Sequence, residues 1–241
     1  MNSDAGAGLP LTEHLRELRQ RLIRSLVVVA VFSLLAYAGI EPIFKLLSIP
    51  LLEVLPPERT LIFTSYPEAF FTYIKLAVTT GIFTASPWIL YEIWAFVAPG
   101  LYGHEKRLMT PFIIFGSILF TGGGIFGYFV VFPAAFRFLA GYESDILALY
   151  PSISEYFTLT IRLLLGFGLA FELPLVLVFL GLAGIIDSKR LRTHRKYALL
   201  GAFVIAAVFT PTPDVINQTL LALPLLLLYE VSIWLLAMLG K

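Results

Sequence analysis

Long runs of apolar residues alternate along this chain with short polar connectors. At roughly 20 residues or more, most of these runs match the length of an α-helix that crosses a lipid bilayer. We therefore expect an all-α membrane protein with six transmembrane helices. The expected spans are residues 22–40, 69–97, 112–139, 153–186, 197–209 and 215–239.

Span 197–209 is shorter than the others. Its helix would rise only about 20 Å, less than the roughly 30 Å hydrocarbon core, so the bilayer thins there or neighbouring protein covers the gap. Proline within other runs removes a backbone hydrogen bond and bends the helix. The bundle is therefore expected to be curved, with bends at Pro87, Pro174 and Pro224.

The sequence also indicates where helices start and where they pack. A serine followed three residues later by glutamate has the spacing of a capping box, and proline is favoured at the first helical position. The glycines at 122–124 lack the strand and lysine of a phosphate loop, so we interpret them as a helix-packing feature. The start signals are Ser65 with Glu68, Ser152 with Glu155, and Thr212 with Pro213.

Composition supports the membrane assignment. Hydrophobic residues make up 59% of the chain and charged residues 14%, whereas roughly a quarter of a soluble domain is charged. The chain length leaves room for one polytopic membrane domain, residues 1–241, and no soluble domain. Without cysteine, and with three scattered histidines, no disulfide, iron–sulfur cluster, zinc site or other cofactor is expected. Nothing indicates a nucleic acid partner.

The distribution of lysine and arginine predicts the orientation. Alternate connectors are strongly basic, which places them and both termini in the cytoplasm. The polar, acidic start lacks the features of a cleaved signal peptide, so the first span is expected to remain. The basic positions on this side are Arg16, Arg19, Arg21, Arg24, Lys106, Arg107, Lys189, Arg190, Arg192, Arg195, Lys196 and Lys241.

Two carboxylates stand among these positive charges. Glu17 lies in LTEHLRELRQRL and Glu105 in FVAPGLYGHEKR. Each has an ordinary interpretation, because Glu17 can pair with Arg21 four residues later and Glu105 can be a solvated loop charge. The functional alternative is a shared site for a basic ligand, since carboxylates bind guanidinium groups through charge-assisted hydrogen bonds.

Glu172 is the candidate within the membrane. It lies in GFGLAFELPLVL, where a charged side chain costs at least about 2.5–3.5 kcal/mol and is expected to face protein or water. A purely structural buried acid is the alternative. Lys75 and Arg162 lie nearer the outer ends of their spans and are expected to snorkel towards the interface. Glu92 and Glu230 are placed near membrane depth or in the interface.

The last span begins with polar residues. They either cap the helix and form a solvated first turn, or they form a docking surface for a polar residue of a partner's helix. The residues are Asp214, Asn217, Gln218 and Thr219.

Several segments together resemble one known family. LTEHLRELRQRL, SPWILYEIWAFVAPGLYGHEKR, YFVVFP, FGLAFELP and FTPTPDVINQTLLALPLLLLYE, in this order, are similar to the TatC family, the polytopic receptor subunit of the twin-arginine protein translocase. The resemblance implies a glove-shaped bundle in the cytoplasmic (inner) membrane of a prokaryote. It further implies binding of twin-arginine signal peptides of folded cargo proteins, transport driven by the proton-motive force, and an oligomeric complex with TatA-type and TatB-type single-span proteins.

The resemblance also implies roles for individual residues. Glu172 matches the family's intramembrane acidic position, and Pro50 and Pro87 match prolines with structural roles. Pro174 is a third structural position, predicted above from the bend that it causes. The connector Thr-Pro-Thr-Pro-Asp is one residue longer than the family's form. The signal-peptide-binding positions are His14, Glu17, Arg19, Phe96, Pro99, Tyr102 and Glu105, and the partner-docking positions are Thr210, Asp214 and Gln218.

Two other function classes compete with this interpretation. A proton- or ion-coupled small-solute transporter would use Glu172 as its coupling site, but the chain shows no internal repeat and no second ionisable group clearly paired with Glu172. An intramembrane enzyme would need a nucleophile and a base. His14, His104 and His194 lie far apart in the sequence and no catalytic motif is present, so no enzymatic activity is expected.

Overall fold

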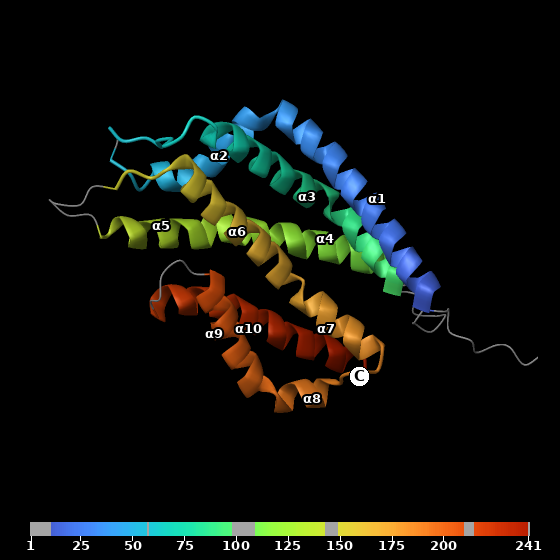
Figure 1. Ribbon diagram of the computed structural model, residues 1–241. Helices are drawn as coiled ribbons and strands as arrows, with labels where there is room; N and C mark the ends of the chain where they lie inside the picture. The colour runs from blue at the N-terminus through green and yellow to red at the C-terminus, as the bar shows by residue number, and fades with distance from the viewer. Residues whose placement is uncertain (1–10, 57, 98–108, 143–148, 210–214, 241) are drawn as a thin grey trace, which may run out of the picture.

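The computed structural model describes residues 11–56, 58–97, 109–142, 149–209 and 215–240, and this part of the chain is almost entirely helical (Figure 1). The all-α prediction is therefore confirmed. Five segments are long and apolar enough to cross a bilayer. They are α1 (Leu11–Ala38), α3 (Glu68–Val97), the continuous α4 (Met109–Phe126), η3 (Gly127–Val131) and α5 (Phe132–Ala140), the pair α6 (Ile153–Phe171) and α7 (Leu173–Leu182), and α10 (Val215–Met238).

Three shorter helices complete the described part of the chain: α2 (Ile40–Leu52), α8 (Ser188–Thr193) and α9 (Arg195–Phe209). The helix α9 corresponds to the short span predicted at 197–209, and its 15 residues rise about 22 Å. The sequence did not predict α2 or α8, which were assigned to connectors. The start of α8 is capped by the Asp187 carboxylate, which accepts a hydrogen bond from the Arg190 backbone N–H at 2.6 Å.

Proline explains two irregularities in the long segments. Pro133 has no N–H to donate to the carbonyl of Phe129, and the backbone forms the π-helical turn η3 there. The apolar run predicted as one span at 153–186 is divided at Glu172, two residues before Pro174, into α6 and α7. The boundary between α6 and α7 thus falls beside Pro174, where the sequence predicts a bend.

The predicted helix starts are only partly correct. The helix α3 begins at Glu68, two residues later than a capping box starting at Ser65 requires. The Glu68 carboxylate nevertheless accepts the Ser65 backbone N–H at 3.2 Å, as in such a box. Ser152 does precede α6, but its side chain caps no backbone group of that helix. Instead, the Ser152 hydroxyl donates to the Glu68 carboxylate on α3. The Glu68 carboxylate therefore serves the starts of both α3 and α6. The third signal, Thr212 with Pro213, lies outside the described residues.

Glycine allows two pairs of helices to approach closely. A Cβ on Gly81 of α3 would lie 2.8 Å from the backbone nitrogen of Ser33 on α1, and a Cβ on Gly123 of α4 would collide with the Phe167 carbonyl of α6. Only glycine permits these contacts. The interpretation of residues 122–124 as a packing feature is confirmed at Gly123 and at Gly124, which packs under the Phe83 ring.

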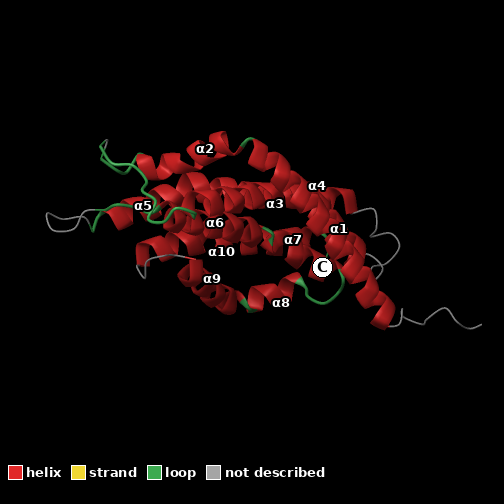
Figure 2. Cartoon of the chain, turned by 45° about the horizontal axis from the view of Figure 1, so that its top comes forward, coloured by secondary structure: helices red, strands yellow, loops and turns green. Residues whose placement is uncertain are grey.

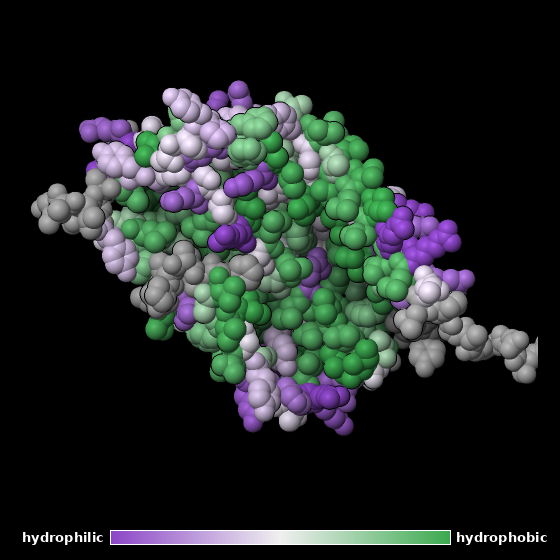
Figure 3. All heavy atoms as spheres, viewed as in Figure 1, coloured by the Kyte–Doolittle hydropathy of each residue, from purple (hydrophilic) through white to green (hydrophobic). Residues whose placement is uncertain are grey.

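The helices define two ends of the bundle. Figures 1 and 2 place the start of α1 and the end of α10 towards one end, called here the terminal end, and the connectors before α3 and α6 towards the opposite end. Figure 3 shows a broad hydrophobic band between hydrophilic residues gathered at both ends. Among the described residues that predict the cytoplasmic side, the basic ones at the start of α1 and in α8 lie on the terminal end.

Candidate functional site

Two helix ends meet at the terminal end of the bundle and form a charged cluster. The Arg21 guanidinium of α1 donates to Glu17 Oε1 on the same helix, from Nε at 2.9 Å and from Nη2 at 2.6 Å. Its third bond runs from Nη1 to Glu92 Oε2 on α3, also at 2.9 Å. Arg21 therefore joins α1 to α3 through Glu92, while Glu17 holds its guanidinium on α1.

The charges in this cluster do not cancel. Two carboxylates and one guanidinium leave one net negative charge. Arg21 hydrogen-bonds to Oε1 of Glu17. No hydrogen bond to Oε2 is found among the described residues, and His14 Nδ1 lies 4.0 Å from it. The Glu17 side chain is 27% exposed. One oxygen of a partly solvated carboxylate is therefore open to a further cationic donor.

An aromatic pair lies beside the cluster. His14 of α1 stacks on Phe96 of α3 with ring centroids 4.3 Å apart and an interplanar angle of 16°. The structure thus brings together His14, Glu17 and Phe96, three of the residues predicted for one site. Arg19 lies on the same helix and is exposed. The other predicted members, Pro99, Tyr102 and Glu105, lie outside the described residues.

Glu92 is the residue of this cluster that the sequence did not predict. Its side chain is 3% exposed, and its partner Arg21 is 71 residues away in the sequence. The sequence placed Glu92 only at membrane depth or in the interface. A buried carboxylate needs a paired or hydrogen-bonded partner. The signal that could have found this pair is a glutamate near the cytoplasmic end of one apolar span and an arginine just before another.

Glu172 forms a second polar position, inside the bundle. The residue is 7% exposed, and neither carboxylate oxygen has a hydrogen-bond partner in the described structure. Its Oε2 lies 3.3 Å from the position that a Cβ on Gly116 of α4 would take. The carboxylate therefore points from the α6–α7 junction towards α4, where the absence of a side chain leaves it room. Its burial agrees with the expectation that it faces protein rather than lipid.

An apolar groove lies close to Glu172. It encloses about 120 Å³, and its walls come from α3, α4 and α7. Leu90 and Leu175 line this groove and also approach Gly116 beside the Glu172 carboxylate. Trp94 lines it too, and its buried indole N–H has no acceptor among the described residues. The other lining residues are Ile93, Val97, Phe112, Ile113, Val176 and Phe179.

The remaining predicted residues are spread over the structure. Gln218 is half-buried near the start of α10, whereas Thr210 and Asp214 lie outside the described residues. Pro50 is buried in α2, Pro87 lies within α3, and Pro174 is buried at the start of α7. The roles predicted for them stay predictions.

Comparison with known proteins identifies the family. The family model of the Sec-independent protein translocase protein (TatC) matches residues 13–224. The chain belongs to the TatC family. A relative from Desulforapulum autotrophicum is 46% identical over 224 residues, which is 93% of this chain and 83% of the relative. The TatC protein of Escherichia coli K12 is 42% identical over 225 residues, covering 93% and 87% of the two chains.

A solved structure agrees with this membership. A crystal structure of the twin-arginine translocase receptor TatC in DDM superposes with a TM-score of 0.81 at 42% sequence identity, covering 92% of this chain and 99% of the other. The fold described above is therefore a TatC fold. As in the bacterial relatives, the apolar helices make the chain a multi-pass protein of the inner membrane.

Proposed function

We propose that this subunit of a Sec-independent protein translocase is the receptor for twin-arginine signal peptides, and that Glu17 is one of the two carboxylates that bind the arginine pair. The observation that carries the proposal is the cluster of Glu17, Arg21 and Glu92. Its surplus negative charge and the open oxygen of Glu17 suit a guanidinium ligand. The His14–Phe96 stack gives an adjacent flat surface.

The internal arginine makes this site more preorganised than two free carboxylates would be. Arg21 holds Glu17 in one orientation, so less side-chain freedom is lost when a ligand binds. Because Glu92 also bonds to Arg21, the guanidinium of Arg21 keeps a charged partner when an incoming arginine draws on Glu17. We therefore assign Glu92 a positioning role.

Glu105 is proposed as the second carboxylate. It belongs to the connector between α3 and α4, and α3 ends at Val97 on the same end of the bundle as Glu17. His14, Arg19, Phe96, Pro99 and Tyr102 are proposed to shape the same site. An arginine presents a planar fork that a carboxylate can accept at two points, whereas a lysine is a point charge. Two carboxylates should therefore prefer arginine at both positions.

The wider translocase is also part of the proposal. TatA-type and TatB-type single-span proteins are proposed to dock at the start of α10 through Thr210, Asp214 and Gln218, within an oligomeric complex. Glu172 would offer a hydrogen bond inside the membrane to an inserted segment. Transport of folded cargo would draw on the proton-motive force. Family membership gives no support to the alternative of a small-solute transporter coupled through Glu172.

Peptide binding to the purified full chain tests the receptor site. Glu17→Gln and Glu105→Gln should each weaken binding of a twin-arginine peptide by about ten- to a hundredfold, which corresponds to one lost charge-assisted interaction of roughly 1.5–3 kcal/mol. The double variant should no longer distinguish twin-arginine from twin-lysine peptides.

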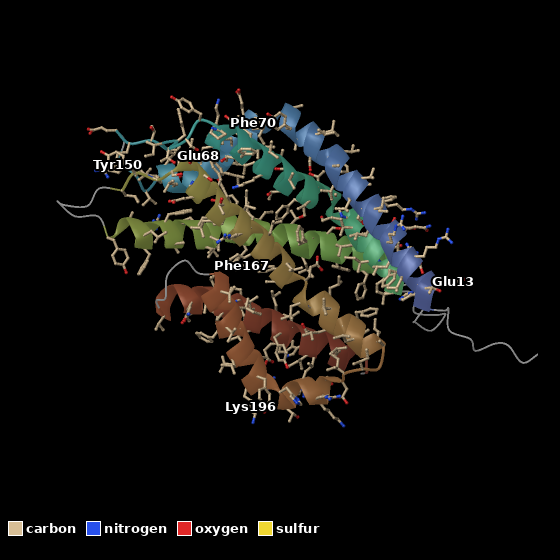
Figure 4. All side chains as sticks on the ribbon, in the orientation of Figure 1. Glu13, Glu68, Phe70, Tyr150, Phe167 and Lys196 are labelled. Carbon is tan, nitrogen blue, oxygen red and sulfur yellow. The ribbon has the colours of Figure 1, made fainter. Side chains whose placement is uncertain are left out.

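Glu13→Gln is the matched control, because Glu13 is exposed one turn before Glu17 on the same helix (Figure 4). Glu58→Gln, at the opposite end, is the second control, and neither should change binding. If the double variant kept the wild-type preference for arginine, the assignment of Glu17 and Glu105 would have to be withdrawn even though the chain remains a TatC protein.

A further inference from the structure

We propose that the groove between α3 and α6, near the opposite end of the bundle, binds the phosphate of a membrane glycerophospholipid. The groove encloses about 330 Å³. Lys75 enters it from α3 and Arg162 from α6, with Thr158 beside both. Lys75 Nζ donates to Thr158 Oγ1 at 3.3 Å, and Thr158 and Arg162 are neighbours at the i, i+4 spacing of one helix. The two cations therefore share one small site.

The two positive charges are not neutralised within the described structure. Its ion pairs use Arg21, Arg195 and His14, and none involves Lys75 or Arg162. Both side chains are exposed, although they belong to helices that cross the membrane. Like charges repel more strongly where the surroundings have a low dielectric constant. An anion bound between them would replace this repulsion with two attractive contacts.

The walls of the groove fit an acyl chain. Apart from Lys75, Arg162 and two threonines, the lining is entirely aliphatic and comes from both helices. An acyl chain fits a groove of this volume better than a helix about 10–12 Å across does. The aliphatic residues are Ile74, Val78, Ile82, Ile161 and Leu165.

The depth of the cations suits a lipid headgroup. Lys75 lies seven residues into α3 and Arg162 nine residues after the start of α6, or about 10 and 14 Å along their helices. Long cationic side chains at such depths reach back towards the headgroup region. In Figure 3, hydrophilic residues over α6 interrupt the hydrophobic band.

A second hollow of about 510 Å³ adjoins the groove and shares Ile74 and Lys75 with it. It contains two carboxylates, those of Glu68 and Glu155. Glu68 already accepts hydrogen bonds at both oxygens, whereas Glu155 is exposed. The polar part of a headgroup beyond the phosphate would lie at this acidic mouth. The site is thus polar at its mouth, cationic in its middle and apolar along its wall. This is the order of headgroup, phosphate and acyl chain along a phospholipid.

Native mass spectrometry of the full chain in detergent tests the proposal with three probes: phosphatidylglycerol, diacylglycerol with the same acyl chains, and inorganic phosphate. Phosphatidylglycerol should bind most tightly to the wild type. The double variant Lys75→Gln/Arg162→Gln should bind it at least about tenfold more weakly. Diacylglycerol should bind weakly and equally to both proteins, because it lacks the phosphate.

The matched control is Lys45→Gln/Arg137→Gln, which removes one exposed lysine and one exposed arginine near the same end of the bundle and should leave phosphatidylglycerol binding unchanged. Thermal unfolding verifies that each variant is folded. Lys75→Arg, which keeps the charge, should retain binding if Lys75→Gln loses it.

Three results would overturn the proposal. The first is an equal loss of binding in the control and the test variant. The second is binding of inorganic phosphate as tight as that of phosphatidylglycerol, which would indicate a site for a free anion. The third is unchanged lipid binding in the double variant together with lost co-purification of a single-span partner, which would assign the cations to an acidic side chain of that partner.

Discussion

The carboxylate of Glu68 connects two helix starts that are more than eighty residues apart in the sequence. Its Oε2 accepts from the backbone N–H groups of Thr64 at 2.5 Å and Ser65 at 3.2 Å, and from the Thr64 hydroxyl at 3.0 Å. Its Oε1 accepts from the Ser152 hydroxyl and from the Ser154 N–H at 2.7 Å. Figure 4 shows Glu68 where α3 begins, close to α6.

Replacing Glu68 with alanine should therefore destabilise the opposite end of the bundle. The Ser154 N–H lies in the first turn of α6, and losing such a cap costs about 0.5–2 kcal/mol. The N–H groups of Thr64 and Ser65 lose their acceptor as well, at about 1 kcal/mol each when water replaces it in the adjoining hollow. The sum is about 2.5–4 kcal/mol, or on the order of 5–16 °C in the unfolding temperature.

Thermal unfolding of the purified full chain, followed by circular dichroism, measures this change. Glu68→Gln should lose less stability than Glu68→Ala, because its carbonyl oxygen can still accept hydrogen bonds from one of the two helix starts. It should lose some stability, because its NH₂ group cannot serve the other. Glu155→Gln is the control, since Glu155 is exposed near the start of the same helix and no hydrogen bond of its side chain is found in the described structure. An unfolding temperature of Glu68→Ala within about 1 °C of the Glu155→Gln value would refute the reasoning. A loss of even about 1 kcal/mol should lower the unfolding temperature by more than that.

Two further predictions concern the carboxylates within the bundle. Glu92→Gln should weaken twin-arginine peptide binding about three- to tenfold, because Arg21 would then neutralise Glu17 alone. Glu230→Gln, which breaks the pair with Arg195 at 2.6 Å, should leave binding unchanged, and an affinity of Glu92→Gln equal to the wild type would remove the positioning role. Glu172→Gln should keep much of the transport measured in cells, whereas Glu172→Leu should impair it, because the site needs a hydrogen-bonding group; equal loss in both folded variants would favour proton coupling instead.

The sequence alone determined the class of the protein and most of its helices. A helix long enough to span the hydrocarbon core is a property of one continuous apolar segment, and so is a bend at proline. The spans at 69–97, 112–139 and 215–239 and the short helix at 197–209 follow from such local features, whereas the run at 153–186, expected as one bent span, is divided beside Pro174. Glu172 could be singled out for the same reason, because an acid in an apolar run stands out without knowledge of its neighbours.

Only the tertiary structure decided which polar groups meet. Arg21 reaches Glu92 across 71 positions, and Glu68 reaches Ser152 across 84. The sequence offered Glu17 as the partner of Arg21 and Ser65 as the partner of Glu68, and in each case the near partner is joined by a distant one on another helix. Such contacts depend on how each helix is rotated and how closely it packs, as at Gly81 against Ser33. Rotation and packing are set by all the helices together, so no single segment of the sequence encodes them.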